Sequence, residues 1–442
     1  NLKDLAHSSN TSETKSITFE YTSQPVWYAL MALPYLNEQE DASAISLFQK
    51  FFANSLAAYI LKSIPESKSL LEAWKKEGSL KSALEKNPEL KSVVLEATPW
   101  LRDAQNETAQ MQGLLKLFSD ATNPIEQKKL IEKLEQLQQT SGGISWFPNM
   151  PESQDITQSV VLGFYQLQHL GALNISEEPE ISAWINKAQN YLTNEINKSY
   201  LQIVRTDSNY LKNEHLGYTE IQYLLLISHL KNKKLSDTEQ YFYHQAQQFA
   251  LNKNNYAKAS IAIALNRMGD QKVPKAILNS LLQSAVNSKK EGMYWKSMNY
   301  SYWYEAPIET QAMIIQAFEE VTHDYETVNE LKTWLLRQKQ THHWNQSKAT
   351  ADACYALLLT GGDWKTSTKK DIIKIDSKTL NPESMSAGTA YIKNTWQVAN
   401  GDKIPENISI KKTKKSPSWG AIYYQYWEDL DQVKSSSEDL NI

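Results

Sequence analysis

A recurring pattern restricts most of this chain to a helical fold. Each copy consists of a turn, a tryptophan, a short polar loop, a threonine and an apolar helix. The three copies are GGISW (142–146) before ITQSVVLGFYQL (156–167), GMYW (292–295) before ETQAMIIQAF (309–318), and THHW (341–344) before ATADACYALLL (349–359). Such self-similarity indicates one supersecondary unit that repeats and packs on its neighbours.

Helical spacing extends well beyond the three copies. Phe48, Phe51, Phe52 and Leu56 share one helix face, and further apolar helices are expected at 80–84, 90–94, 126–138, 215–230 and 256–268. The segment 98–108 has no clean period and is expected to be a loop or a helix entry. Helices that are apolar nearly all round must pack on both neighbours, which predicts a closed ring of helical hairpins, an α/α toroid. The tryptophan before each inner helix is expected to fill the gap between hairpins.

Both ends of the chain alternate instead with the period of a β-strand. Strands are expected at 15–21, around Ile373 and Ile375, at 390–398, at Ile408 and Ile410, and at 421–427, all in one sheet. The predicted fold is therefore mainly α, with the toroid inserted in a smaller β-sandwich. The predicted boundaries are 1–24 for the first β part, 25–365 for the toroid, 366–431 for the remaining β part and 432–442 for a linker.

Composition excludes several classes of function. The net charge of −4 over 442 residues gives no basic field for nucleic acid. One cysteine allows neither an internal disulfide nor a cysteine-based zinc cluster, and no run of 18 apolar residues is present. The start, NLKDLAHSSN, is not a signal peptide, so we expect the chain to be cut from a longer protein.

Several segments together resemble bacterial alpha-2-macroglobulins of the type found in Bacteroidetes. They are PVWYALMALPYL (25–36), FFANSLA (51–57), TPWLRDAQNET (98–108), GGISWFPN (142–149), YWYEAPIETQAMII (302–315), WLLRQKQ (334–340), ATADACYALLLTG (349–361) and SWGAIYYQYWEDL (418–430). The resemblance covers nearly the whole chain. It implies a thioester-type toroid inserted in a CUB-like β-domain, with macroglobulin domains before and after it in the full protein.

The resemblance also locates a degenerate site. In the family a Cys thiol and the side-chain carbonyl of a Gln three residues later close a thioester, which acylates an attacking protein. A gap-free match puts that Cys on Ser43, the family's Glu on Ile45 and its Gln on Ser46. An alternative match puts Glu38 and Gln39 on the Glu-Gln pair, and it also lacks a thiol. Cys354, in an apolar helix, is expected to be a core residue.

Other candidate residues have plainer interpretations. Asp155 and Glu309 could be an acid and a base, but equivalent repeat positions favour a role at helix N-termini. His342 and His343 are expected in a solvated turn, and His215 and His229 in packing contacts rather than at a metal. KKTKK (411–415) is expected to be a solvated hairpin tip, and the many Trp and Tyr side chains to pack the ring rather than to bind sugars. No zinc-protease, Walker or Gly-rich phosphate motif is present.

The resemblance implies a non-enzymatic function. We expect part of a macroglobulin-like protein that traps proteases without a covalent bond or defends the envelope, with no catalytic residue, cofactor or metal. Expected partners are the other macroglobulin domains of the same chain and proteases, with no nucleic acid. The expected location is the periplasm or cell envelope, with any membrane anchor outside this segment. The former site, Ala42 to Leu47, is expected to pack against the CUB-like domain or a macroglobulin domain. The alternatives are an α/α-toroid enzyme, such as a polysaccharide lyase or glycosidase, and a purely structural protein-binding module.

Overall fold

The computed structural model describes residues 13–22, 26–39, 41–63, 112–288, 291–296, 306–338, 343–344, 346–360, 371–379, 391–413 and 418–427. The chain divides into two compact units, which are described separately. The helical unit is residues 28–362, and the β unit combines residues 1–27 with 363–442. The helices expected at 80–84 and 90–94 and the loop expected at 98–108 lie outside the described residues.

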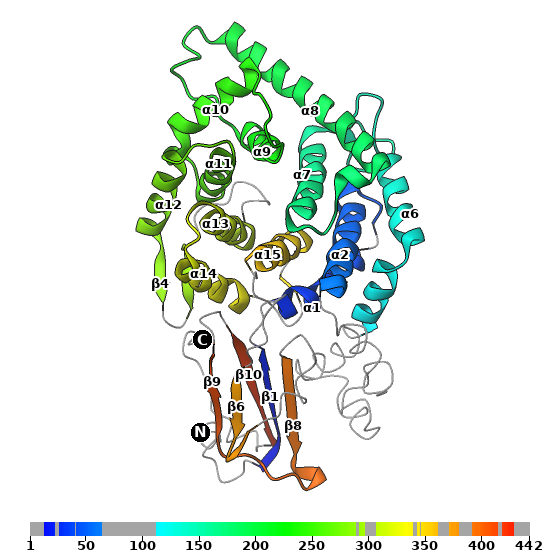
Figure 1. Cartoon of the computed structure of the whole chain (residues 1–442), viewed down its shortest axis with the longest axis vertical. Coiled ribbons are helices and arrows are strands. Elements are labelled where there is room, and N and C mark those ends of the chain that lie inside the picture. The colour runs from blue at the N-terminus through cyan, green and yellow to red at the C-terminus, as the bar shows by residue number, and fades with distance from the viewer. Residues whose placement is uncertain are drawn as a thin grey trace. The chain divides into compact units, whose positions relative to one another are not determined.

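Within the described part of the helical unit, six helices form a closed inner ring (Figure 1). In chain order they are α2 (Ala44–Ser63), α7 (Gln154–Leu170), α9 (Tyr218–Ile227), α11 (Asn255–Arg267), α13 (Pro307–Val321) and α15 (Ser347–Leu359). Each contacts the next one, and α15 contacts α2. The ring therefore closes on itself.

The other helices lie outside this ring (Figure 1). They include α6 (Pro124–Glu135), α8 (Pro179–Thr206), α10 (Asp237–Phe249), α12 (Val273–Ser284) and α14 (Tyr325–Arg337), while α1 (Val26–Asn37) leads into α2. From α7 onward, inner and outer helices alternate along the chain, so each pair is one helical hairpin. This arrangement confirms the predicted α/α toroid.

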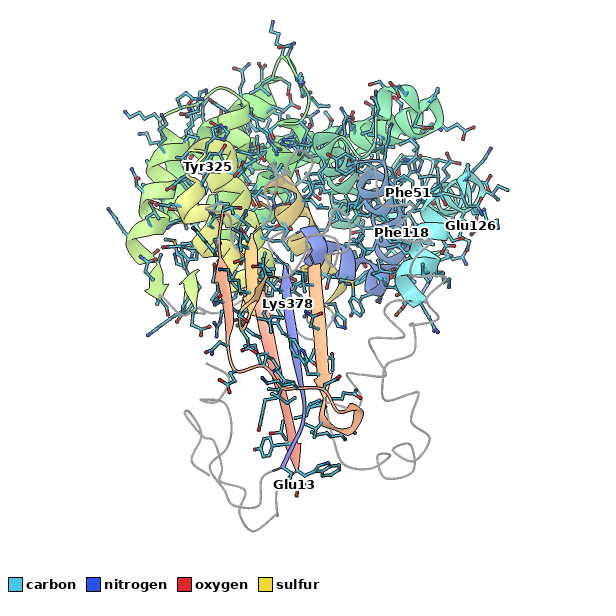
Figure 2. The ribbon with its side chains drawn as sticks, turned by 60° about the horizontal axis from the view of Figure 1, so that its bottom comes forward. Glu13, Phe51, Phe118, Glu126, Tyr325 and Lys378 are labelled. Atoms are coloured by element: carbon cyan, nitrogen blue, oxygen red, sulfur yellow. The ribbon has the colours of Figure 1, made fainter. Side chains whose placement is uncertain are left out.

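Burial explains which helices become inner ones. In α9 every residue from Ile221 to Ile227 is buried, whereas α8 buries a single stripe that includes Ile181, Ile185 and Leu192. An inner helix packs on three sides, and an outer helix faces water on one side. Figure 2 shows Phe51 on α2 among the side chains of the helical unit and Glu126 on α6 at its edge.

One helix of the described residues, α2, is long and apolar enough to cross a membrane by length and composition alone. Most of its residues are buried, and it packs against α6, α7 and α15. That burial is the pattern of a core helix, so its composition is weak evidence for a membrane segment.

The inner helices run in the same direction. Contacts between neighbouring inner helices join the start of one to the start of the next, and the end of one to the end of the next. Near the starts of α7 and α9, Gln158 Nε2 donates to the carbonyl of Thr219 at 3.0 Å. Near the ends of α11 and α13, Arg267 Nε donates to Glu320 Oε2 at 2.7 Å. The ring thus has an N-terminal face, where inner helices begin, and a C-terminal face, where they end.

The β unit contains two three-stranded sheets. In the first, β1 (Glu13–Thr22) lies between β8 (Tyr391–Gln397) and β10 (Trp419–Trp427), antiparallel to both. In the second, β6 (Ile372–Ile375) lies between β7 (Lys378–Thr379) and β9 (Ile408–Lys411). The expectation of one sheet was therefore wrong for β6 and β9, while the predicted sandwich is present.

The core of the β unit explains the second sheet. Phe19, Tyr21 and Ile392 come from the first sheet and Ile373 from the second, and all four are at most 3% exposed. A single sheet would leave this apolar face in water, so the second sheet covers it.

The helical unit adds two short hairpins, β2 (Ile144–Ser145) with β3 (Glu152–Ser153) and β4 (Val286–Ser288) with β5 (Gly292–Tyr294).

Candidate functional site

The positions that were expected to match a thioester, Ser43, Ile45 and Ser46, lie at the start of an inner helix. Ser43 directly precedes α2, and its Oγ accepts a hydrogen bond from the backbone N–H of Ser46 at 3.1 Å. The carbonyl of Ser43 accepts from the N–H of Leu47 at 2.9 Å. Ser43 is therefore a helix N-cap, which satisfies backbone donors that have no partner within the helix.

Asp41, which the sequence analysis did not single out, completes this cap. Its Oδ1 accepts from the N–H of Ser43 at 2.9 Å, and its Oδ2 accepts from Ser46 Oγ at 2.7 Å. Burial alone would raise the pKa of Asp41, but the hydrogen bonds from Ser43 and Ser46, with the charge of Lys50, lower it below its ordinary value. Asp41, Ser43 and Ser46 thus form one connected group, here named the α2 cap.

The α2 cap contains neither a thiol nor a side-chain amide. Ser43 and Ser46 are buried, at 4% and 6% exposure, and Ile45 is a partly buried side chain without a carboxyl group. The single cysteine of the sequence, Cys354, lies on α15, where its Sγ donates to the carbonyl of Ala29 at 3.5 Å. A thioester needs a sulfur and a side-chain carbonyl carbon, and no side chain at 43–46 supplies either.

An exposed apolar surface adjoins the α2 cap. The N–H of Ala44 donates to the carbonyl of Trp146 at 2.8 Å, which ties the start of α2 to the loop between β2 and β3. In that loop the rings of Trp146 and Phe147 stack with centroids 5.8 Å apart. Trp146 is 48% exposed, Phe147 38% and Met150 46%. These three residues are named the Trp146 surface.

The exposure of Trp146 corrects the expectation that each repeat tryptophan fills a gap between hairpins. Trp344 does so, because it is fully buried and its Nε1 donates to the carbonyl of Leu335 at 2.9 Å. Trp295 is partly buried and donates to the carbonyl of Leu281 at 3.1 Å. In the first copy the backbone of Trp146 makes the structural contact, and its side chain is left in solvent.

A second polar group lies at the centre of the N-terminal face. Glu309 belongs to the first turn of α13, Lys348 and Asp352 to α15, and Tyr218 begins α9. Lys348 Nζ is 2.6 Å from Asp352 Oδ2, and it also interacts electrostatically with Tyr218 and Glu309. Because α9 and α15 are not neighbours in the ring, this group spans its centre.

Glu309 has the unusual carboxyl group of this cluster. It is 1% exposed, and neither of its carboxylate oxygens has a hydrogen-bond partner among the described residues. Burial is the main cause that raises its pKa to about 7, with Lys348 opposing this and Asp352 adding to it. Asp155, by contrast, is exposed in the first turn of α7. The two carboxylates therefore occupy similar repeat positions in different environments.

The remaining candidate residues do not converge on one site. His215 Nε2 lies 2.8 Å from Asp207 Oδ2, and the ring of His343 stacks on Tyr35. Lys411 to Thr413 are exposed, while His342 and the last two residues of KKTKK lie outside the described residues. In the part of the chain that the structure describes, no three His, Cys, Asp or Glu side chains are placed to hold a metal ion. His229 belongs to a cluster around Arg267, described below, that the sequence analysis missed.

Comparison with known proteins assigns no family. No family model matches the chain, and no curated protein matches its sequence. Among solved structures, the chain is similar to the native conformation of E. coli alpha-2-macroglobulin, at 12% identity and a TM-score of 0.45. That alignment covers 94% of this chain and 22% of the other. A likeness this distant does not assign a function.

Proposed function

We propose that this chain is part of a macroglobulin-like envelope or periplasmic protein that binds its partners without a covalent bond. The observation that carries the proposal is the α2 cap. Ser43 and Ser46 stand where the resembling family has its thioester, and both are engaged in starting α2. A buried serine with its hydroxyl hydrogen-bonded to a carboxylate has no route to an acylating thioester. The function that we propose is therefore non-covalent binding.

The proposed partners are proteases and the other macroglobulin domains of the same protein. The Trp146 surface supports a protein-binding role, because exposed aromatic side chains and methionine are enriched where proteins bind each other. Its backbone contact with Ala44 places it beside the α2 cap. A partner that binds there contacts a site of fixed geometry.

Labelled methylamine tests the chemical half of this proposal. The full-length protein is incubated with the amine, with and without proteolytic cleavage, and digested for mass spectrometry. We expect no label at residues 43–46. The matched control is the triple variant Ser43→Cys, Ile45→Glu, Ser46→Gln, which restores the family's residue types. A covalent amine adduct at 43–46 of the natural sequence would sink the proposal.

Protease capture tests the binding half. We expect complexes with a protease that survive native chromatography and separate in SDS. A complex that persists in SDS without a cross-linker contradicts non-covalent trapping. If no protease is retained, proteases are ruled out as partners. The other domains of the same protein then remain as the proposed partners.

A toroid enzyme is the second candidate, and Glu309 is the observation that favours it. A carboxyl group with a pKa of about 7 near a second carboxylate, Asp352, is a pairing suited to acid–base chemistry. The 1% exposure of Glu309 argues against access by a substrate. Turnover of any polysaccharide in a panel that is lost in Glu309→Gln would favour the enzyme.

A further inference from the structure

Arg267 forms the centre of a second cluster, on the C-terminal face of the ring. At the end of α11 its guanidinium makes a two-pronged contact with Glu320 of α13. Nε donates to Oε2 and Nη2 to Oε1, both at 2.7 Å. The two side chains are only 13% and 12% exposed. Such paired, charge-assisted hydrogen bonds fix the relative position of the two helix ends.

The same guanidinium reaches two further inner helices. Nη1 lies 2.7 Å from Nε2 of His229, just after α9, and 3.4 Å from Ser228 Oγ. Nη2 lies 3.2 Å from Nδ1 of His169 in the last turn of α7. Since α7 and α13 are not neighbours in the ring, Arg267 joins helix ends across its centre. Arg267, Glu320, His169 and His229 are named the Arg267 cluster.

The contacts determine where the imidazole protons lie. A guanidinium has five N–H donors and no acceptor, so each contacting histidine nitrogen must accept. His229 therefore carries its proton on Nδ1, and His169 carries its proton on Nε2. Protonating either ring removes the lone pair that accepts from Arg267. It also places a second positive charge in contact with the guanidinium.

The groups around His229 and His169 lower the pKa of both rings and so disfavour their protonated, charged forms. Burial first, then Arg267 and His169, hold the pKa of His229 well below its ordinary value. The pKa of His169 is lowered by burial, Arg267 and Lys231, and raised by Glu320. Its ring is more exposed than that of His229, so we assign it the smaller role.

Two tyrosines complete the surroundings of the Arg267 cluster. Tyr165 of α7 stacks on His229 with ring centroids 5.5 Å apart. On α15, Tyr355 interacts with Arg267 and Glu320. Neither phenol supplies a negative charge near neutral pH, since burial raises the pKa of both above the ordinary value.

We propose that the Arg267 cluster is an acid-sensitive latch, which holds the C-terminal ends of α7, α9, α11 and α13 together and loosens when His229 is protonated. The sign follows from linkage. A group whose pKa is depressed in the folded state stabilises that state above its unfolded pKa of about 6.5, and the stabilisation is lost as pH falls. Each histidine that must gain a proton on opening can shift the equilibrium up to about tenfold per pH unit. The latch does not depend on the partner-binding function proposed above.

Hydrogen exchange between pH 7.5 and pH 5 tests the latch. Rates are corrected for the intrinsic pH dependence, and the readout is the opening equilibrium of the last turns of α7, α9, α11 and α13. In the natural sequence we expect opening to increase about fivefold between pH 6.5 and 5.5, because His229 in the open state is already about half protonated at pH 6.5. In His229→Gln, which keeps an acceptor and cannot be protonated, most of this increase should disappear. The matched control is His244→Gln, at an exposed position of α10, and it should retain the increase.

A second measurement does not need the variant and applies even if His229→Gln does not fold. It is the titration of the imidazole groups of the natural sequence, followed by NMR. We expect the pKa of His229 in the natural sequence to lie well below its ordinary value, with loss of protection in the four helix ends as pH falls. An ordinary titration of His229 near pH 6.5, or equal pH dependence in the natural sequence and His229→Gln, overturns the proposal.

Discussion

Replacing Glu309 with glutamine should change how stability depends on pH. Glu309 is 1% exposed, and its pKa rises from 4.5 to about 7 on folding. Because the pKa of Glu309 is higher in the folded than in the unfolded state, its contribution to the free energy of unfolding is fully present below pH 4.5. It is then lost as pH rises through 7. The difference of about 2.5 (7 − 4.5), at 1.36 kcal/mol for each pKa unit, corresponds to about 3 kcal/mol.

Urea unfolding of the natural sequence and Glu309→Gln between pH 5 and pH 8 measures this effect. Glutamine keeps the shape of the side chain but cannot ionise. The free energy of unfolding of Glu309→Gln, relative to the natural sequence, should therefore rise by about 2 to 3 kcal/mol between pH 5 and pH 8. Because both proteins contain the same histidines, the titration of the Arg267 cluster cancels in the comparison.

Glu126→Gln is the control for this experiment. Glu126 lies on α6 with its side chain 41% exposed and pairs with Lys129 one turn later. Its replacement should change stability by less than about 0.5 kcal/mol at either pH, as is usual for exposed ion pairs. If Glu309→Gln and the natural sequence have parallel stability curves, then Glu309 ionises in the folded protein as it does in water. The burial argument would then be wrong.

Three further substitutions test separate parts of the structure. Ser43→Ala should lower the free energy of unfolding by about 1 kcal/mol, because it removes the N-cap of α2; an unchanged urea midpoint would contradict the α2 cap. Gly163→Ala should cost about 1–3 kcal/mol, because the added Cβ would lie 2.3 Å from the ring of Phe48, and Phe48→Leu in the same protein should recover part of that loss. Tyr21→Phe should cost about 1–2 kcal/mol in thermal unfolding, because it removes the buried 2.6 Å hydrogen bond to Asp371 Oδ2; equal stability would mean that the bond contributes nothing.

The helical part of the fold could be predicted because its cause is local. An inner helix packs on both neighbours and on the outer layer, so its sequence is apolar nearly all round, as in α11 and α13. Two sequence-distant copies of that pattern are enough to predict a repeat. Strand alternation carries less information, because it shows which face is buried but not which strand pairs with which. The assignment of β6 and β9 to the first sheet failed for that reason.

The two polar clusters were harder to predict, because their members are far apart in sequence. Arg267 lies 38 residues from His229, 53 from Glu320 and 98 from His169. No spacing rule connects such positions before the ring is known. The α2 cap did leave a signal, since Asp41 and Ser43 precede an apolar helix, as N-capping residues do.

The parallel direction of the inner helices explains why hydrogen-bond acceptors and negative charge gather where α2 begins. Six helices that begin on one face place the positive ends of their dipoles there, so acceptors and negative charge stabilise that face. Carboxylates meet this need in α7 and α9, with Asp155 and Glu220 in their first turns. Asp41 does the same for α2 through its bonds to Ser43 and Ser46. On the opposite face the cationic Arg267 meets the negative ends. The hydrogen bonds of Asp41 and Ser43 therefore give α2 a stable start, and the Trp146 surface lies beside that start.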